Sequence, residues 1–104
     1  MFPVPLKPTL TVQNNVVNYQ TGANTDLTCV SVGADQYQFY KGGSPVTSDG
    51  FTASDTLTIT NFQLVNQGAY TCKGKNGAGE AASDALTLTL SEFFFHKLNK
   101  DITV

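Results

Sequence analysis

One short stretch, residues 68–72 with the sequence GAYTC, constrains the fold of this chain more than any other when it is considered together with Cys29. Tyr70 lies two residues before Cys72, and Cys29 lies 43 residues before Cys72. Residues two apart in a strand point to the same face, so Tyr70 and Cys72 would enter one core. In an antiparallel β-sandwich, such a tyrosine buries its ring at a sheet corner while its hydroxyl satisfies a backbone group upstream. The stretch therefore predicts a sandwich.

Apolar and polar residues alternate with the period of a β-strand in several segments, and no segment shows the period of a helix. The clearest alternation lies at 56–60 and at 86–90, where threonines separate the apolar residues. Turn signals recur about every ten residues along the chain. Hydrophobic residues make up 40% of the 104 residues, which is enough for the core of one domain. These features predict a single all-β domain.

At these positions the sequence resembles an immunoglobulin-like domain of the I-set or C2 type, over residues 9–91. Besides Cys29 and Cys72, the matching core positions are Leu27, Phe39, Leu57, Gly68 and Tyr70. The resemblance implies a β-sandwich of two antiparallel sheets with about seven to eight strands in Greek-key order. It also implies that the two cysteines meet in the core, either as a disulfide or, in a reducing compartment, as a buried thiol pair.

Two positions depart from the family pattern. Phe39 stands where the family has a core tryptophan, and the chain contains no tryptophan. Asn66 stands where the family commonly has an aspartate that pairs with a buried arginine, and the chain contains no arginine. The two losses are consistent with each other, because either partner alone would leave an unpaired buried charge. Only 18 residues separate Phe39 from Leu57, too few for the extra strands of a variable-type domain.

The two ends of the chain differ in composition from the sandwich between them. Residues 1–8 hold three of the four prolines and are expected to form an extended lead-in. Residues 92–104 form an aromatic tail that contains Phe93, Phe94, Phe95 and Leu98. Because exposed apolar clusters normally mark contact surfaces, these four residues are candidates for binding a partner. The tail could anchor the domain to an assembly, begin a second repeat, or fold back over its own domain.

Charge and residue inventory argue against several classes of function. A net charge of −2 without arginine lacks the basic stripe of a nucleic-acid-binding protein. No apolar run approaches the roughly 20 residues that span a bilayer. The single histidine, His96, lies in the tail, far from the cysteines, so neither a hydrolase triad nor a zinc site is expected. We therefore expect a non-enzymatic protein with no metal and no cofactor.

Recognition by an outer surface is the function that remains. Tyr40, Lys73 and Lys75 are expected to point outward from one sheet, beside an exposed Gln38, and are candidates for contact with a partner.

Phe62 and Leu64 are expected to close the lower end of the core.

The biological setting is predicted from smaller signs. A Met start without a leader, the absence of any Asn-x-Ser/Thr sequon and the apolar tail favour a short display protein on a particle. The chain resembles the immunoglobulin-like domains that decorate bacteriophage capsids and tails. That resemblance implies a virion surface, a capsid or tail protein as partner, and weak adhesion to a host-surface glycan or protein. The alternative is a module of an extracellular cell-adhesion protein or of a muscle-type tandem array.

Overall fold

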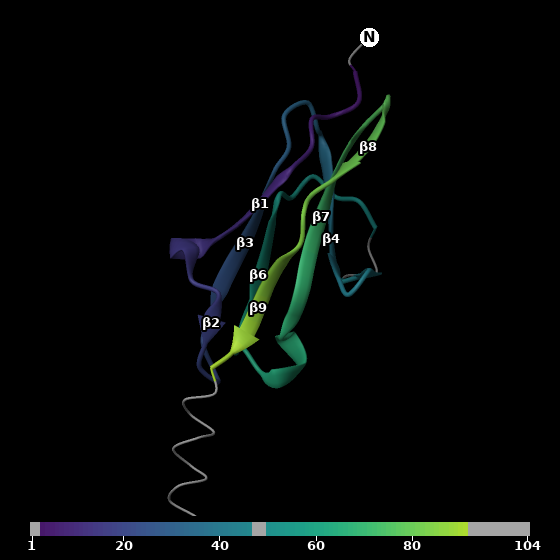
Figure 1. Ribbon diagram of the computed structural model, residues 1–104. Helices are drawn as coiled ribbons and strands as arrows, with labels where there is room; N and C mark the ends of the chain where they lie inside the picture. The colour runs from purple at the N-terminus through teal and green to yellow at the C-terminus, as the bar shows by residue number, and fades with distance from the viewer. Residues whose placement is uncertain (1–2, 47–49, 92–104) are drawn as a thin grey trace, which may run out of the picture.

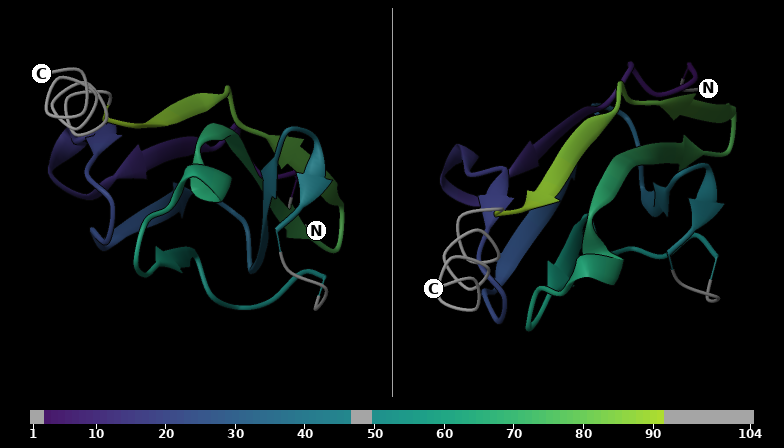
Figure 2. Two further views of the ribbon diagram at one scale, coloured as in Figure 1. Left: turned by 90° about the horizontal axis from the view of Figure 1, so that it is seen from below. Right: turned by 60° about the horizontal axis from the view of Figure 1, so that its bottom comes forward.

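Two β-sheets pack face to face in the computed structural model, which describes residues 3–46 and 50–91 (Figures 1 and 2). The smaller sheet has the order β1-β3-β6, and the larger has the order β2-β9-β7-β4-β5 with β8 also paired to β7. The strands of the smaller sheet are β1 (Thr9–Val12), β3 (Thr25–Val30) and β6 (Thr56–Ile59). Those of the larger sheet are β2 (Asn18–Tyr19), β4 (Gln36–Lys41), β5 (Ser44–Pro45), β7 (Gly68–Asn76), β8 (Gly79–Ala82) and β9 (Leu86–Leu90). The prediction of an all-β, immunoglobulin-like sandwich is confirmed.

One pairing differs from the expectation of purely antiparallel sheets. β2 pairs with β9 in parallel, through Asn18 opposite Thr89 and Tyr19 opposite Leu90. The cause is a change of sheet. The chain leaves β1 through the 3-10 turn η1 (Gln13–Asn15) and then runs on in the same direction beside the other sheet. Within that turn Asn14 has a φ of 56°, a left-handed conformation that asparagine tolerates better than most residues.

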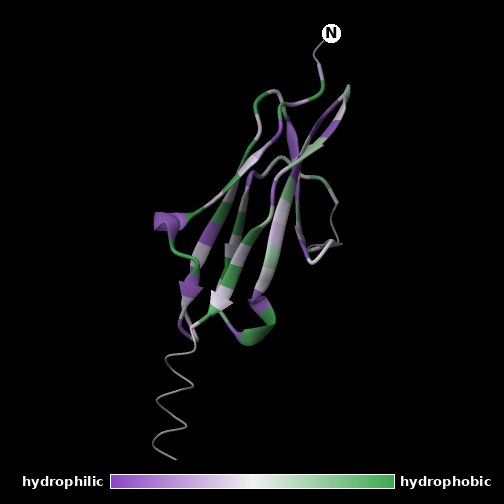
Figure 3. Cartoon of the chain, viewed as in Figure 1, coloured by the Kyte–Doolittle hydropathy of each residue, from purple (hydrophilic) through white to green (hydrophobic). Residues whose placement is uncertain are grey.

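The core lies between the two sheets and is built from the alternating apolar positions of both (Figure 3). Leu27, Phe62 and Leu88 are fully buried. The rings of Tyr19 and Phe62 lie with their centroids 5.0 Å apart at the lower end of the core. Leu64 does not help to close this end, contrary to the expectation, because it lies in the 3-10 turn η2 (Leu64–Asn66) with 62% of its surface exposed.

Residues 3–8 lie in extended form along the upper end of the sandwich. The Leu6 N–H donates to the Val32 carbonyl at 3.0 Å, and the Leu6 carbonyl accepts from Ser31 Oγ at 3.1 Å. Asn76 Nδ2 donates to the Pro3 carbonyl at 2.7 Å. The described chain therefore begins at one end of the sandwich and leaves β9 at the other (Figure 1).

Candidate functional site

A disulfide between Cys29 of β3 and Cys72 of β7 joins the two sheets, with the Cα atoms 6.0 Å apart. Phe39 lies opposite Cys72 in the β4–β7 ladder and is buried beside the disulfide, where the family has tryptophan. Tyr70 is 2% exposed, and its hydroxyl donates to the Asn66 carbonyl. Burial raises the pKa of the Tyr70 hydroxyl above its ordinary value. These groups provide a rigid scaffold beneath the outer surfaces.

The remaining core positions singled out by the resemblance lie around this scaffold. Leu27 is fully buried, and Leu57 is partly buried against the same cluster. Gly68 begins β7 with a φ of 154°, at a point where the Lys41 side chain would lie 3.2 Å from an added Cβ. Lys41 itself reaches η2 and donates to the Val65 carbonyl.

The outer face of β4, β7 and β8 brings together three of the residues that the sequence suggested for partner binding, Tyr40, Lys73 and Lys75, with Phe51 from the loop before β6. The Lys73 ammonium lies 5.2 Å from the centroid of the Tyr40 ring. The Lys75 ammonium lies 5.0 Å from the centroid of the Phe51 ring. Ammonium groups at this distance are attracted by the aromatic ring face. We call this group of four side chains the lysine–aromatic face.

One hydrogen bond and one ion pair also hold side chains of the lysine–aromatic face in place. The Tyr40 hydroxyl donates to Gln38 Oε1 at 2.8 Å, which holds the ring in place. Gln38 was expected to be exposed, but it is only 9% exposed, because Tyr40 bonds to it and Lys73 lies directly opposite in the ladder. Glu80 of β8 lies 3.7 Å from the Lys73 ammonium. Sequence reasoning missed Glu80, because only the β7–β8 pairing places it beside this surface.

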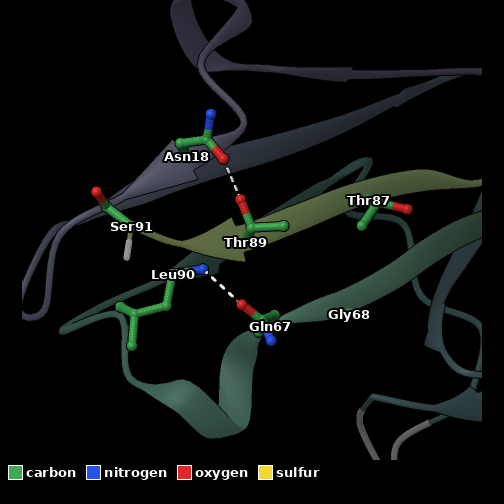
Figure 4. Close-up of a pocket in the computed structure, with 7 residues that line it drawn as sticks. All are labelled: Asn18, Gln67, Gly68, Thr87, Thr89, Leu90 and Ser91. Atoms are coloured by element: carbon green, nitrogen blue, oxygen red, sulfur yellow. Dashed lines mark hydrogen bonds between the residues drawn. The ribbon is translucent and has the colours of Figure 1, made fainter. Parts of the chain in front are cut away.

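A shallow cavity of about 680 Å³ lies at the opposite end of the same sheet, where β9 ends (Figure 4). Asn18 Oδ1 accepts a hydrogen bond from the Thr89 hydroxyl, and Gln67 Oε1 accepts from the Leu90 N–H at 2.9 Å. The lining of this cavity carries no charge. It consists of Asn18, Gln67, Gly68, Thr87, Thr89, Leu90 and Ser91. No sequence signal distinguished this cavity, because outward threonines are ordinary on any solvated strand.

The other candidate residues for partner binding are not placed. Phe93, Phe94, Phe95 and Leu98 lie outside the described residues. Within residues 3–46 and 50–91, no group of three or more His, Cys, Asp or Glu side chains is arranged to hold a metal ion. The same ranges contain no helix with the length and apolar character needed to cross a bilayer.

Comparisons with known proteins agree with the two-sheet sandwich described above. A family model described as "Immunoglobulin domain" matches residues 7–76. A search of curated protein sequences found no match.

Solved structures show the same fold at low sequence identity. The second Ig-C2 domain of human Fc-receptor like A is 23% identical with a TM-score of 0.70, covering 86% of this chain and 99% of that chain. Murine CEACAM1b is 21% identical with a TM-score of 0.70, covering 86% of this chain and 46% of that chain. A complex of the mouse coronavirus receptor-binding domain with its murine receptor matches with the same identity, coverage and TM-score.

Proposed function

The chain belongs to the immunoglobulin domain family, and we propose that it is a non-enzymatic recognition module that binds a protein partner through the lysine–aromatic face. Domains of this family are typically non-enzymatic, commonly extracellular, and act by binding or adhesion. The observation that carries the proposal is the pair of cation–π contacts on one sheet face, Lys73 over Tyr40 and Lys75 over Phe51.

The chemistry of this face suits a protein surface with acidic and apolar groups. Aromatic side chains supply contact area at low cost in conformational entropy, and Tyr40 is further held by Gln38. Two ammonium groups beside two rings can pair with carboxylates while the rings pack against apolar groups. Glu80 offsets part of the positive charge, so recognition combines charge with shape.

We place this module on a virion surface, as a decoration protein docked on a capsid or tail through its C-terminal residues 92–104. The described chain starts at one end of the sandwich and leaves β9 at the other, so an anchor in residues 92–104 would leave the lysine–aromatic face free. The free face would then adhere weakly to a host-surface protein or glycan. The lack of any Asn-x-Ser/Thr sequon agrees with this setting.

An extracellular adhesion module is the second candidate, and the Cys29–Cys72 disulfide favours it. Disulfides form and persist in oxidising compartments. One similar structure is a complex of the mouse coronavirus receptor-binding domain with its murine receptor, so a protein that contains this fold takes part in protein–protein recognition. In this setting the partner would be a protein on an apposed cell or a neighbouring immunoglobulin domain.

A binding assay with surface variants tests the proposed face. Virions and cells are both taken from a culture that carries the gene. The fluorescently labelled full chain is incubated with each of them separately. We expect Lys73→Glu/Lys75→Glu to weaken binding to cells at least roughly tenfold, because both cationic contacts reverse sign. Binding to virions, which we assign to residues 92–104, should be unchanged.

The single variant Lys73→Glu is compared with Lys7→Glu, which changes the net charge by the same amount but lies on another part of the molecule, beside Asp84. Equal loss of binding in both variants would mean that net charge alone explains the effect, which would contradict the proposal.

Truncation after Ser91 tests the anchor separately. The shortened chain should fold with the same thermal unfolding midpoint but no longer sediment with virions. Binding to cells, if it uses the lysine–aromatic face, should be unchanged. A truncated chain that still binds virions as the full chain does would refute the anchor and leave the adhesion setting in its place.

A further inference from the structure

β6 forms one border of the smaller sheet and lacks the features that usually protect such a border (Figure 2). In the part of the chain that the structure describes, its only strand neighbour is β3. A border strand exposes unpaired backbone N–H and C=O groups, and proteins commonly shield them with charged residues, proline or a bulge. The sequence of β6 is Thr-Leu-Thr-Ile, which contains neither charge nor proline.

The other border strands carry such protection. β5 contains Pro45, which cannot donate a hydrogen bond to an added strand. β8 carries the charged Glu80, paired with Lys73. Residues 84–86 lie beside β1 across a small cavity, and Lys7, just before β1, pairs with Asp84 at 2.8 Å. β2, at the border of the larger sheet, is only two residues long and offers little backbone to a further strand. Among the described strands, β6 is therefore the border open to a further strand.

The ladder between β3 and β6 shows which backbone groups face outward. The Cys29 N–H donates to the Asp55 carbonyl at 2.8 Å, just before β6 begins. Bonding alternates along an antiparallel strand, so Leu57 and Ile59 also bond toward β3. The N–H and C=O groups of Thr56 and Thr58 consequently point away from the sheet.

Ser54 covers one of these two residues. Its hydroxyl accepts from the Thr56 N–H at 3.4 Å and donates to the Thr56 carbonyl at 3.2 Å. Both bonds are long, so they are weak and exposed to competition from water. The structure describes no such cover for Thr58.

We propose that a second copy of this chain pairs antiparallel with β6, which joins two three-stranded sheets into one. A two-fold axis through Leu57 places Thr56 of one copy opposite Thr58 of the other. The outward groups of these residues then form roughly four backbone hydrogen bonds. Threonine pairs on the solvent face of a sheet are favourable, and Asp55 lies opposite Ile59, so no like charges meet. This self-complementary register argues for a second copy rather than an unrelated strand.

The pairing leaves the lysine–aromatic face of each copy free, because that face belongs to the other sheet. Such a short strand buries less than the roughly 1,200 Å² of a stable interface, so the dimer is weak. We expect a dissociation constant of roughly 0.1–1 mM. The dimer presents two lysine–aromatic faces. Together they would bind a repetitive surface with avidity, even though each single contact is weak.

Dilution of the full-length, oxidised chain tests the pairing. Amide NMR spectra are recorded from about 1 mM down to about 20 µM, a range that spans the expected dissociation constant, with sedimentation equilibrium in parallel. The amide signals of Thr56 and Thr58 should move with concentration, while those of Lys73 and Lys75 should not. Spectra that do not depend on concentration, or shifts confined to other residues, overturn the proposal.

Variants at the border separate backbone pairing from other association. Thr58→Pro removes the outward N–H but keeps the bonds to β3, so it should abolish dimerisation without unfolding the chain. Thr58→Val is its matched control, because it keeps the N–H, and should dimerise like the wild type. Ser54→Ala uncovers Thr56 and should tighten dimerisation roughly threefold to tenfold. Wild-type dimerisation of Thr58→Pro, or no tightening in Ser54→Ala, contradicts the proposal.

Discussion

Gly74, in the middle of β7, occupies a position that has no room for a side chain. An added Cβ would lie 2.6 Å from Ser31 Cβ and closer still to Ser31 Oγ. Ser31 cannot easily give way, since its hydroxyl donates to the Leu6 carbonyl and holds the first described residues. Close packing between β7 and the turn after β3 therefore depends on this glycine.

We expect Gly74→Ala to lower the free energy of unfolding by about 1–3 kcal/mol, because the methyl group forces Ser31 to move. Urea unfolding followed by circular dichroism measures the change. Gly77→Ala is the matched control, because an added Cβ there meets nothing within 4 Å. Equal stabilities of the two variants would show that β7 and Ser31 are not in contact.

Tyr70 is the residue whose chemistry links the fold to pH. Its buried hydroxyl donates to the Asn66 carbonyl, and burial raises its pKa. In the unfolded chain the phenol ionises near its ordinary pKa of about 10, so above that pH the unfolded state loses the proton first. The contribution of Tyr70 is fully present below about pH 10 and is lost as pH rises through the raised pKa of the folded state.

Tyr70→Phe should therefore lower the free energy of unfolding by about 1–2 kcal/mol at pH 7, and the difference from wild type should shrink above about pH 10. Urea unfolding at pH 7 and at stepwise higher pH measures both effects. Tyr37→Phe serves as control, because its hydroxyl makes a longer bond of 3.3 Å to the Ala34 carbonyl. A difference that grows with alkaline pH would contradict the assignment.

At the scale of the elements, two sets of interactions connect strands that are far apart in sequence. The disulfide joins β3 to β7 through the core. Asn76, at the end of β7, connects three segments at the upper end. Its Nδ2 donates to the carbonyls of Pro3 and Gly33 at 2.7 and 3.0 Å, and its Oδ1 accepts from the Ala78 N–H at 2.8 Å.

Removal of the disulfide should lower the free energy of unfolding by roughly 3–4 kcal/mol, because the bond closes a long loop in the unfolded chain. The double variant Cys29→Ala/Cys72→Ala and the reduced wild-type chain should lose similar amounts. Chemical denaturation with and without a reductant makes the comparison. Reduction that leaves the midpoint unchanged would mean that the two sulfurs are not bonded in the native protein.

Asn76→Asp keeps the size of the side chain and its acceptor but replaces two donated bonds by contacts between a carboxylate and carbonyl oxygens. We expect a loss of roughly 2–3 kcal/mol at neutral pH. The control is Asn24→Asp, since Asn24 is exposed and already acts as an acceptor for the Asn61 N–H. Thermal unfolding at pH 7 compares the two, and an equal change in both would exclude the structural role of Asn76.

At the scale of the whole molecule, the sandwich could be predicted because its signals are local in sequence. The spacing of Cys29, Tyr70 and Cys72 and the period-two segments are read directly from the chain. The positions of Leu64, Gln38 and Glu80 could not be read in this way. They depend on the path of η2 and on which strand lies beside which, and those are set by packing over long sequence separations.

The lysine–aromatic face was predicted in part for the same reason. Alternation placed Tyr40, Lys73 and Lys75 on one side of the sheet, but the contact of Lys75 with Phe51 depends on a loop whose course carries no period. The bridge between Tyr37 and Thr52 brings that loop beside β4. The face as a unit therefore becomes visible only in the folded chain.

Hydrogen exchange of the chain, free and bound to the cell surface that retains it, tests the central claim most directly. If the molecule is a rigid sandwich that recognises its partner through the lysine–aromatic face, binding should slow exchange in peptides that cover 36–41 and 71–82. Peptides that cover 9–12 and 25–30, in the other sheet, should exchange at unchanged rates. Slower exchange in the smaller sheet with none in β4, β7 and β8 would contradict the account.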